Sequence, residues 1–245
     1  MKGVVIVGGQ GTRLQPVTRA INKHLQLVGT LPMFFWPLRT LAQAGIEDVL
    51  LVCGGKTPGH FMELAVDGRE FGLHLLYAYQ HEPRGIADAL RCAERYVGGD
   101  DCCLMLGDTI LDDCLGDFLA CFDAQGYGAR MLLQEVPDPE RCAVVEWDEA
   151  GQVRRIVEKP VAPPSNMAVL GAYCFDRKVW DYLHSMRPSE RGQYEVSDLL
   201  QLYLMAGALT YQVYTGQYAD AGTLPGYRRA CEIAWEMSEK CQSES

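Results

Sequence analysis

The chain has 245 residues, of which 48% are apolar, enough for a full core in one large domain or two small ones. No apolar stretch approaches the ~20 residues that cross a bilayer, and no leader peptide precedes the first apolar segment, so we expect a cytoplasmic protein without a membrane partner. The net charge of −10 argues against nucleic acid as a partner, because phosphate backbones are bound by clustered Lys and Arg.

Strand-like and helix-like segments alternate through the first half of the chain. Strands are predicted at 4–7, 48–52, 73–79, 102–106 and 128–136, and helices at 32–44, 58–67, 86–96 and 113–124. This alternation is typical of an α/β fold with a Rossmann-like, doubly wound and mostly parallel sheet, in which ligands bind at the carboxyl ends of the strands.

Beyond about residue 136 the pattern becomes more antiparallel. Segments 142–147 and 153–157 flank a turn and predict a hairpin, and a strand follows at 168–175. Helices are predicted at 176–184 and 193–206, a strand at 209–214 and a last helix at 224–240. We predict one domain over residues 1–245, composed of a first half (1–136), an inserted antiparallel half (137–223) and a carboxyl-terminal helix with its tail (224–245).

The most informative segment is Gly8-Gly9-Gln10-Gly11-Thr12-Arg13-Leu14, directly after the first predicted strand. Three glycines in four positions let the backbone turn sharply, and their N–H groups can cradle phosphate oxygens. Arg13 adds a guanidinium fork for the same oxygens. A tight turn after the first strand of any α/β protein is the alternative interpretation.

Three further charged side chains stand at or near the ends of predicted strands. Lys23 follows the glycine segment, Asp108 closes the apolar strand 102–106, and Asp220 follows the last predicted strand. Either aspartate alone is better explained as a cap or turn residue. Two of them beside a phosphate-binding loop predict a magnesium site, because Mg²⁺ typically takes one or two carboxylates and completes its shell with water and phosphate oxygens.

Other cofactor sites fit the sequence poorly. Leu14 stands where a dinucleotide fingerprint has its third glycine, and no acid ends strand 48–52 to hold a ribose. No Gly-Lys-Ser/Thr follows the glycines, as a P-loop requires. The ten cysteines include no Cys-x-x-Cys pair and the five histidines are scattered, so we expect buried, reduced thiols and no zinc site.

These residues resemble the sugar-1-phosphate nucleotidyltransferases (NDP-sugar pyrophosphorylases), and most of all the short-form glucose-1-phosphate thymidylyltransferases. The family signature Gly-Gly-x-Gly-Thr-Arg-Leu-x-Pro-x-Thr is met by Gly8 through Leu14, Pro16 and Thr18. The resemblance continues in order along the chain, at Asn22-Lys23-His24-Leu25, Pro32-Met33, Ala44-Gly45-Ile46, Gly85-Ile86-Ala87, Leu106-Gly107-Asp108, Asp138-Pro139-Glu140-Arg141, Glu158-Lys159-Pro160, Ser165-Asn166, Gly171, Arg191-Gly192, Glu195, Asp198 and Asp220-Ala221-Gly222-Thr223. It implies the nucleotide-diphospho-sugar transferase fold, with residues 1–136 binding the nucleotide and 137–223 the sugar.

The resemblance also implies a role for each matching residue. The nucleotide would be held by the backbone of Gly8, Gly9, Gly11 and Thr12, with Arg13 and Lys23 as catalytic cations at the triphosphate and Gln80 and Gly85 at the pyrimidine edge. Mg²⁺ would be bound by Asp108 and Asp220, and the sugar phosphate would lie against Asp108, Ala143, Glu158, Lys159 and Val169. Without the resemblance, Glu158-Lys159 would be interpreted as a surface ion pair.

The implied reaction transfers a nucleotidyl group from a nucleoside triphosphate to a sugar 1-phosphate and releases pyrophosphate. The resemblance favours dTTP and glucose 1-phosphate as the two substrates. The phosphate nucleophile has a second pKa of about 6 and is ionised at pH 7, so no general base is needed. UTP or CTP, another sugar phosphate, and a non-catalytic sugar-nucleotide-binding protein remain alternatives, and a homo-oligomer is left open.

Five positions depart from the family pattern. Leu31 stands where a lysine is usual, Thr109 follows the metal aspartate in place of Asn, and Asp88 replaces Gln. Cys142-Ala143 stands where an aromatic residue and a glycine line the sugar site, so the choice of sugar stays open. A hydrophobic contact to one methyl yields only about 1–3 kcal/mol, so use of both dTTP and UTP is expected.

Overall fold

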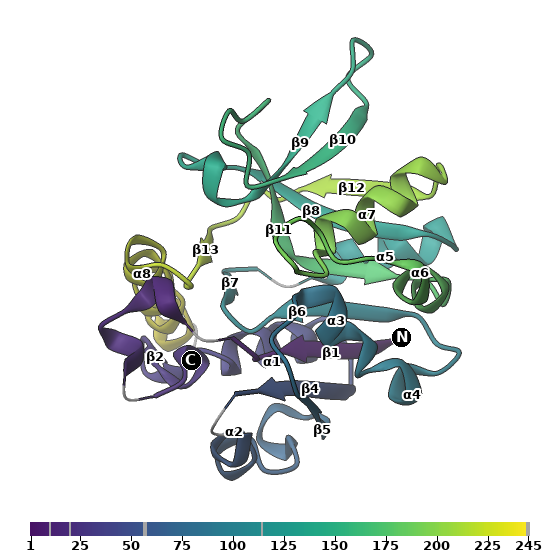
Figure 1. Cartoon of the computed structure of the whole chain (residues 1–245). Coiled ribbons are helices and arrows are strands. Elements are labelled where there is room, and N and C mark those ends of the chain that lie inside the picture. Colours follow the sequence, from purple (N-terminus) through teal and green to yellow (C-terminus); the bar gives the residue numbers. More distant parts are fainter. Residues whose placement is uncertain (10, 20, 56–57, 114, 244–245) are drawn as a thin grey trace.

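The computed structural model describes residues 1–9, 11–19, 21–55, 58–113 and 115–243. Its centre is a nine-stranded mixed sheet in the order β10-β9-β11-β6-β1-β4-β5, with β8 paired to both β11 and β12 (Figure 1). The strands are β1 (Lys2–Ile6), β4 (Asp48–Gly54), β5 (His74–Gln80), β6 (Cys102–Leu106), β8 (Ala129–Glu135), β9 (Ala143–Trp147), β10 (Val153–Glu158), β11 (Met167–Phe175) and β12 (Leu209–Val213).

The first half of the chain forms the parallel part of the sheet. Strand β1 lies parallel to β4 and β6, and its Ile6 is in register with Val52 and with Leu106. The carboxyl ends of these three strands therefore open at one edge of the sheet. Strand β11 lies antiparallel to β6 and to β8, and the predicted antiparallel hairpin is formed by β9 and β10.

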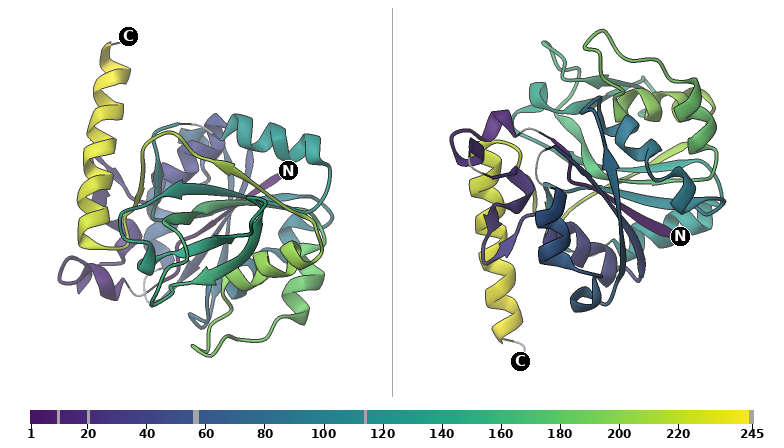
Figure 2. Two further views of the ribbon diagram at one scale, coloured as in Figure 1. Left: turned by 90° about the horizontal axis from the view of Figure 1, so that it is seen from above. Right: turned by 60° about the horizontal axis from the view of Figure 1, so that its bottom comes forward.

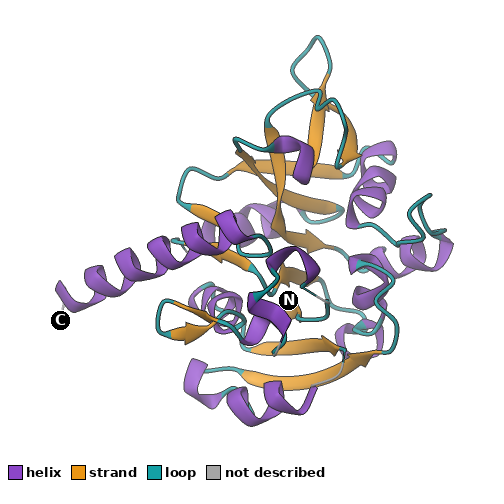
Figure 3. Cartoon of the chain, turned by 60° about the vertical axis from the view of Figure 1, so that its left-hand side comes forward, coloured by secondary structure: helices purple, strands orange, loops and turns teal. Residues whose placement is uncertain are grey.

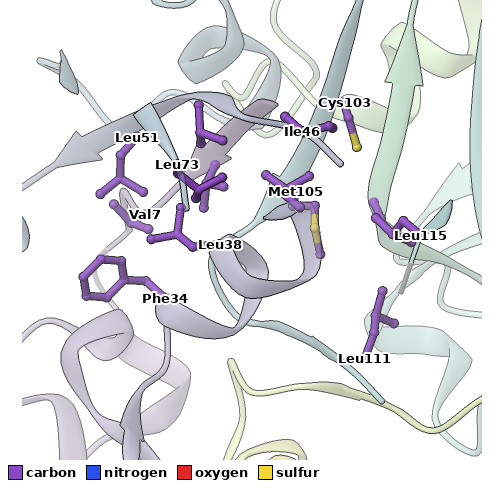
Figure 4. Close-up of a cluster of buried hydrophobic side chains, with 14 of the residues drawn as sticks. Val7, Phe34, Leu38, Ile46, Leu51, Leu73, Cys103, Met105, Leu111 and Leu115 are labelled. Atoms are coloured by element: carbon purple, nitrogen blue, oxygen red, sulfur yellow. The ribbon is translucent and has the colours of Figure 1, made fainter. Parts of the chain in front are cut away.

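Helices cover both faces of the sheet, as predicted for a doubly wound fold. Along β1 and the residue that follows it, Val5 and Val7 face one core while Val4 and Ile6 face the other, as expected for a strand that is buried on both sides. The first core is covered by α1 (Phe35–Gln43), α2 (Pro58–Ala65) and α5 (Gly116–Gln125). Some of its buried side chains, among them Val7, Leu38 and Met105, are drawn in Figure 4. The second is covered by α3 (Ile86–Arg91), α4 (Glu94–Val97), α6 (Val179–Ser185) and α7 (Val196–Met205).

Two short antiparallel pairs lie outside the main sheet. Strand β7 (Thr109–Leu111) pairs with β13 (Tyr218–Asp220), and β2 (Leu27–Val28) pairs with β3 (Leu31–Pro32). Helix α8 (Leu224–Ser243) packs Ala230, Ile233 and Ala234 against the β7–β13 pair in a third apolar cluster. The far end of α8 extends beyond the rest of the molecule (Figures 2 and 3).

Several predicted boundaries were wrong for identifiable reasons. Helix α1 begins at Phe35 rather than at 32, because Pro32 belongs to β3 and pairs with Leu27 of β2. The predicted helix 86–96 is divided into α3 and α4. Strands β7 and β13 have three residues each, too few for an apolar pattern to be recognised.

The cysteines follow the prediction only in part. Cys102 and Cys103 lie in opposite cores, as expected for neighbours on a strand. Among the described cysteines, all of them free, those in the interior are Cys53, Cys102, Cys103 and Cys174, whereas Cys121 is exposed. No helix among the described residues has both the length and the apolar character that crossing a membrane requires.

Candidate active site

A cavity of about 190 Å³ opens where the carboxyl ends of β1 and β6 meet the hairpin β9–β10. The candidate residues that line it are Gly8, Arg13, Lys23, Asp108, Ala143, Glu158, Lys159, Val169 and Asp220. Five other candidates do not line this cavity: Gly9, Gly11, Thr12, Gln80 and Gly85. Gln80 is close to the lining residue Gly8, because its Oε1 lies 3.3 Å from where a Cβ of Gly8 would be. Residues predicted to act together thus come from both halves of the chain.

The glycine segment continues directly from β1. Gly9 has φ 143° and Gly11 has φ 60°, conformations that favour glycine. A Cβ at Gly54 would fall 3.2 Å from the Cα of Gly8, so two glycines allow the ends of β1 and β4 to approach closely. Gln10 lies outside the described residues.

Arg13 lies in a single turn of 3₁₀-helix, Thr12–Leu14. Leu14 is fully buried and anchors this turn, while Arg13 is exposed beside the cavity. The guanidinium of Arg13 has no hydrogen bond or ion pair with any residue that the structure describes. It is therefore a cation available to an anionic ligand.

Lys23 and Asp108 form a largely buried ion pair. Lys23 begins the 3₁₀-helix Lys23–Leu25, which the side chain of Asn22 caps by accepting from the N–H of His24 at 3.0 Å. Lys23 Nζ contacts Asp108 Oδ2, and the two side chains are 13% and 12% exposed. Burial is the largest single influence and raises the pKa of Asp108, but the charge and hydrogen bond of Lys23, together with His24 and a backbone N–H, hold the pKa of this carboxyl well below its usual range.

His24 lies beside this ion pair and stays neutral. Burial, reinforced by the charge of Lys23, lowers the pKa of His24 to about 3. Its ring Nδ1 lies 3.1 Å from Asn22 Oδ1. His24 therefore adds no positive charge beside Lys23 at neutral pH.

Asp220 reaches the same point from the other end of the chain. The β7–β13 pairing sets Asp220 opposite Thr109, and the N–H of Ala221 donates to the carbonyl of Asp108 at 2.9 Å. Burial and the charge of Asp108 raise the pKa of Asp220, against the opposing effect of Lys23. The N–H of Gly222 donates to Asp220 Oδ1 at 2.8 Å, so this carboxylate also has the turn-capping role considered from the sequence.

Gly222 marks the point on which the three charges converge. A Cβ at this residue would lie 2.8 Å from Asp220 Oδ1, 2.9 Å from Asp108 Oδ2 and 3.4 Å from Lys23 Nζ. One carboxylate oxygen of Asp108 and one of Asp220 thus lie close together beside Gly222, and such a pair suits Mg²⁺, which needs few protein ligands. No group of three or more potential metal ligands occurs within the described ranges.

The hairpin β9–β10 builds the part of the cavity that the sequence predicts to bind the sugar phosphate. Ala143 lies opposite Glu158 in the strand register, and the N–H of Lys159 donates to the carbonyl of Cys142 at 3.0 Å. Lys159 has φ 43°, a strained left-handed conformation for a residue with a side chain. Its Nζ lies 2.5 Å from Glu158 Oε1, so the ion pair that the sequence alone predicts is present. The pair lies at the wall of the cavity.

Glu158 is held by a second set of contacts. Ser197 Oγ donates to Glu158 Oε2 at 2.9 Å, and Arg191 Nη1 lies 3.5 Å from Glu158 Oε1 and 3.4 Å from Glu195 Oε1. These contacts hold the carboxylate of Glu158 in place at the wall of the cavity.

Sequence reasoning missed the basic wall of an adjoining cavity. A space of about 680 Å³ is lined by Arg13, Glu140, Arg141, Lys159, Arg191, Thr223, Leu224 and Pro225. Arg141 also lines the first cavity, yet the sequence assigned no role to Arg141 or Arg191. Their only signal was membership of the matching segments Asp138-Pro139-Glu140-Arg141 and Arg191-Gly192.

The residues predicted at the pyrimidine edge lie next to each other. Gln80 ends β5, and its Nε2 donates to the carbonyl of Gly85 at 3.2 Å. Gly85 has φ 112°, and a Cβ there would fall 2.3 Å from the carbonyl oxygen of Tyr194, so only glycine fits.

A glycine turn, two cations and two converging carboxylates at the carboxyl ends of parallel strands define an α/β protein that binds phosphorylated ligands. The chain belongs to the nucleotidyl transferase family, whose model matches residues 2–235. The cations and carboxylates all fall inside this matched region.

Curated relatives carry the same family name in more specific form. The glucose-1-phosphate thymidylyltransferase of Neisseria meningitidis serogroup A is 39% identical over 226 residues, which are 91% of this chain and 78% of that protein. The enzyme of that name from Xanthomonas campestris pv. campestris is 41% identical over 225 residues, 91% of this chain and 76% of that protein.

Solved structures share the fold. A Bacillus anthracis protein provisionally described as a glucose-1-phosphate thymidylyltransferase, crystallised with sucrose, superposes with a TM-score of 0.90. It is 39% identical, and the match covers 96% of this chain and 95% of that one. A UDP-glucose pyrophosphorylase with UDP-glucose has a TM-score of 0.81 at 20% identity, over 96% of this chain and 98% of that one, and so shows the fold alone.

Proposed function

We propose that this chain transfers a thymidylyl group from dTTP to glucose 1-phosphate, giving dTDP-glucose and pyrophosphate. The observation that carries the proposal is the clustering of Asp108, Asp220 and Lys23 around Gly222, in the cavity that the exposed Arg13 also lines. The family membership and the names of the relatives support the same reaction. Residues 1–136 form its nucleotide-binding half, 137–223 its sugar-binding half, and 224–245 the helix and tail of the same domain.

The nucleotide half supplies positive charge and backbone donors. The N–H groups of Gly8, Gly9, Gly11 and Thr12 hold phosphate oxygens, and Arg13 neutralises the charge that grows on the leaving pyrophosphate. Lys23 keeps Asp108 ionised in the free protein and turns toward the triphosphate when it binds. Asp108 and Asp220 would hold Mg²⁺, which when bound neutralises triphosphate charge.

The sugar half orients the nucleophile. Glu158, fixed by Ser197, accepts hydrogen bonds from sugar hydroxyls, and Lys159 pairs with the sugar phosphate. Ala143 and Val169 supply the apolar wall, and Asp108 lies where the two substrates meet. The reaction needs no proton abstraction, because the sugar phosphate is already ionised at pH 7.

A pyrophosphate-release assay over a grid of triphosphates and sugar 1-phosphates tests this function. We expect turnover with dTTP and glucose 1-phosphate that requires Mg²⁺, and weaker turnover with UTP. Release only with CTP or with another sugar phosphate would retain the reaction and replace the substrates. No release from any combination would leave a protein that binds sugar nucleotides without catalysis.

Replacing Gly222 with Ala is expected to lower activity at least ten-fold and to raise the Mg²⁺ concentration needed for half-maximal rate. The new methyl group would lie under 3.0 Å from both carboxylate oxygens and would push them apart. Gly222 does not need a positive φ, so the backbone accepts alanine. The matched control is Gly59→Ala in α2, where a Cβ meets nothing within 4 Å. An unchanged Mg²⁺ dependence in Gly222→Ala would contradict the placement of the metal.

A further inference from the structure

A buried acid lies behind Gln80 in the nucleotide half. Asp88, in α3, is 7% exposed, and its Oδ2 accepts a hydrogen bond from Gln80 Nε2 at 2.9 Å. Its Oδ1 accepts from Arg84 Nη2 at 3.0 Å and lies 3.5 Å from Arg91 Nη1. With two guanidinium groups on one oxygen, this carboxylate acts as an acceptor on both of its oxygens.

Tyr194 holds the guanidinium of Arg91 and the backbone of Arg84 in place. The guanidinium carbon of Arg91 lies 4.1 Å from the centre of the Tyr194 ring, and the N–H of Tyr194 donates to the carbonyl of Arg84 at 2.7 Å. The segment after Gly85 is tied to the same residue, because the N–H of Ala87 donates to the carbonyl of Tyr194 at 3.1 Å. Asp88 therefore has a fixed position and a fixed set of donors.

This arrangement decides which way the amide of Gln80 points. Both hydrogens of Nε2 are used, one by Asp88 Oδ2 and one by the carbonyl of Gly85. A flipped amide would set Oε1 against two oxygens that cannot donate. Oε1 consequently points toward Gly8, 3.3 Å from where a Cβ of that residue would lie, and accepts no hydrogen bond from the residues that the structure describes.

We propose that Asp88 is a positioning residue that makes Gln80 an obligate acceptor and thereby selects thymine or uracil over cytosine. The inference rests on the proposed function, in which Gln80 faces the pyrimidine edge. Thymine and uracil have one donor on that edge, N3–H, between two carbonyl oxygens. Cytosine has a lone pair at N3, and its only donor is the neighbouring amine, so an acceptor placed for N3–H meets a second acceptor.

The aspartate at position 88, where the family pattern has glutamine, changes which groups face the amide of Gln80. A glutamine there could present either its oxygen or its nitrogen, and would leave the amide of Gln80 free to turn. An aspartate presents only oxygen. The methyl group of thymine takes no part in this hydrogen bond, so the orientation of Gln80 does not distinguish thymine from uracil.

The test is the equilibrium affinity of dTTP, dUTP and dCTP in the presence of Mg²⁺, measured by calorimetry on the whole chain. We expect the wild-type protein to bind dTTP and dUTP at least ten-fold more tightly than dCTP. In Asp88→Asn, the amide oxygen stays with the arginines and its nitrogen faces Gln80, so the ratio of dTTP to dCTP affinity falls at least five-fold. Asp88→Gln is the second variant and should also lower the ratio of dTTP to dCTP affinity. The test therefore does not depend on the stability of a single variant.

The control separates orientation from packing. Arg84→Ala removes the 3.0 Å hydrogen bond to Asp88 but leaves the carboxylate an acceptor, so it is expected to lower thermal stability and keep the affinity ratio. An unchanged ratio in both variants at position 88, or a wild-type protein that does not distinguish dCTP, would overturn the proposal. Failure of the proposed transferase function would appear separately, as binding of dTTP without pyrophosphate release.

Discussion

Asp108→Asn is expected to lower kcat/KM by about 10³-fold or more, the scale seen when one charge-stabilising group is removed from an active site. Asparagine keeps the shape of the side chain and removes the charge that Lys23 and the proposed metal share. Pyrophosphate release is measured against Mg²⁺ concentration, and the far-UV circular dichroism spectrum should be unchanged.

The same substitution has a separate effect on stability. Lys23 would lose its partner inside the protein, and breaking a buried ion pair from one side costs about 3–5 kcal/mol. Adding Lys23→Met to Asp108→Asn should restore part of the melting temperature but none of the activity. Asp67→Asn, at an exposed ion pair with Arg69, serves as the control with little effect on either. Wild-type rates in Asp108→Asn would refute the metal assignment.

Arg13→Ala is expected to lower kcat by about 10²–10³-fold while KM for glucose 1-phosphate changes little. The guanidinium has no partner within the described part of the chain and would meet the leaving pyrophosphate, whose charge grows only as the bond breaks. For the same reason the melting temperature should stay within error, since an exposed side chain without contacts contributes little to folding.

Arg19→Ala is the matched control for Arg13. Arg19 is an exposed arginine six positions along the chain and lines neither of the two cavities that Arg13 lines. Its loss should leave kcat unchanged. If Arg13→Ala raised only KM for the sugar phosphate, the guanidinium would act at the sugar phosphate and its assignment to pyrophosphate would be wrong.

The parallel half of the fold could be predicted because each of its strands is recognisable from its own residues. Strands such as Cys102–Leu106 are apolar on both faces and are recognised without knowledge of their partners. The place of β11 between β6 and β9 depends on pairings between distant segments, which no local pattern encodes. Strands β7 and β13 were missed for the same reason, and because each is so short.

The candidate site likewise combines residues that a local pattern predicts with contacts between distant segments that no local pattern predicts. Gly8 and Asp108 were recognised because parallel strands end at one edge, and the register of Ile6 with Leu106 brings those ends together. The approach of Asp220 to Asp108 depends on the β7–β13 pairing, and the direct contact of Lys23 with Asp108 depends on packing in three dimensions. Arg141 and Arg191 were named in the sequence without a role, because exposed arginines are common and only the adjoining cavity distinguishes them.

The apolar cluster beneath β7 and β13 gives helix α8 a part in setting the geometry of the acids. Ile110 and Ala219 lie within one residue of Thr109 and Asp220, and both are buried in the cluster that includes Ala230 and Ile233 of that helix. Small side chains in α8 let it approach the two strands closely, and a larger residue at Ala230 would have to displace them. The distance between the two carboxylates is therefore fixed in part by a helix that contributes no charged group to the cavity.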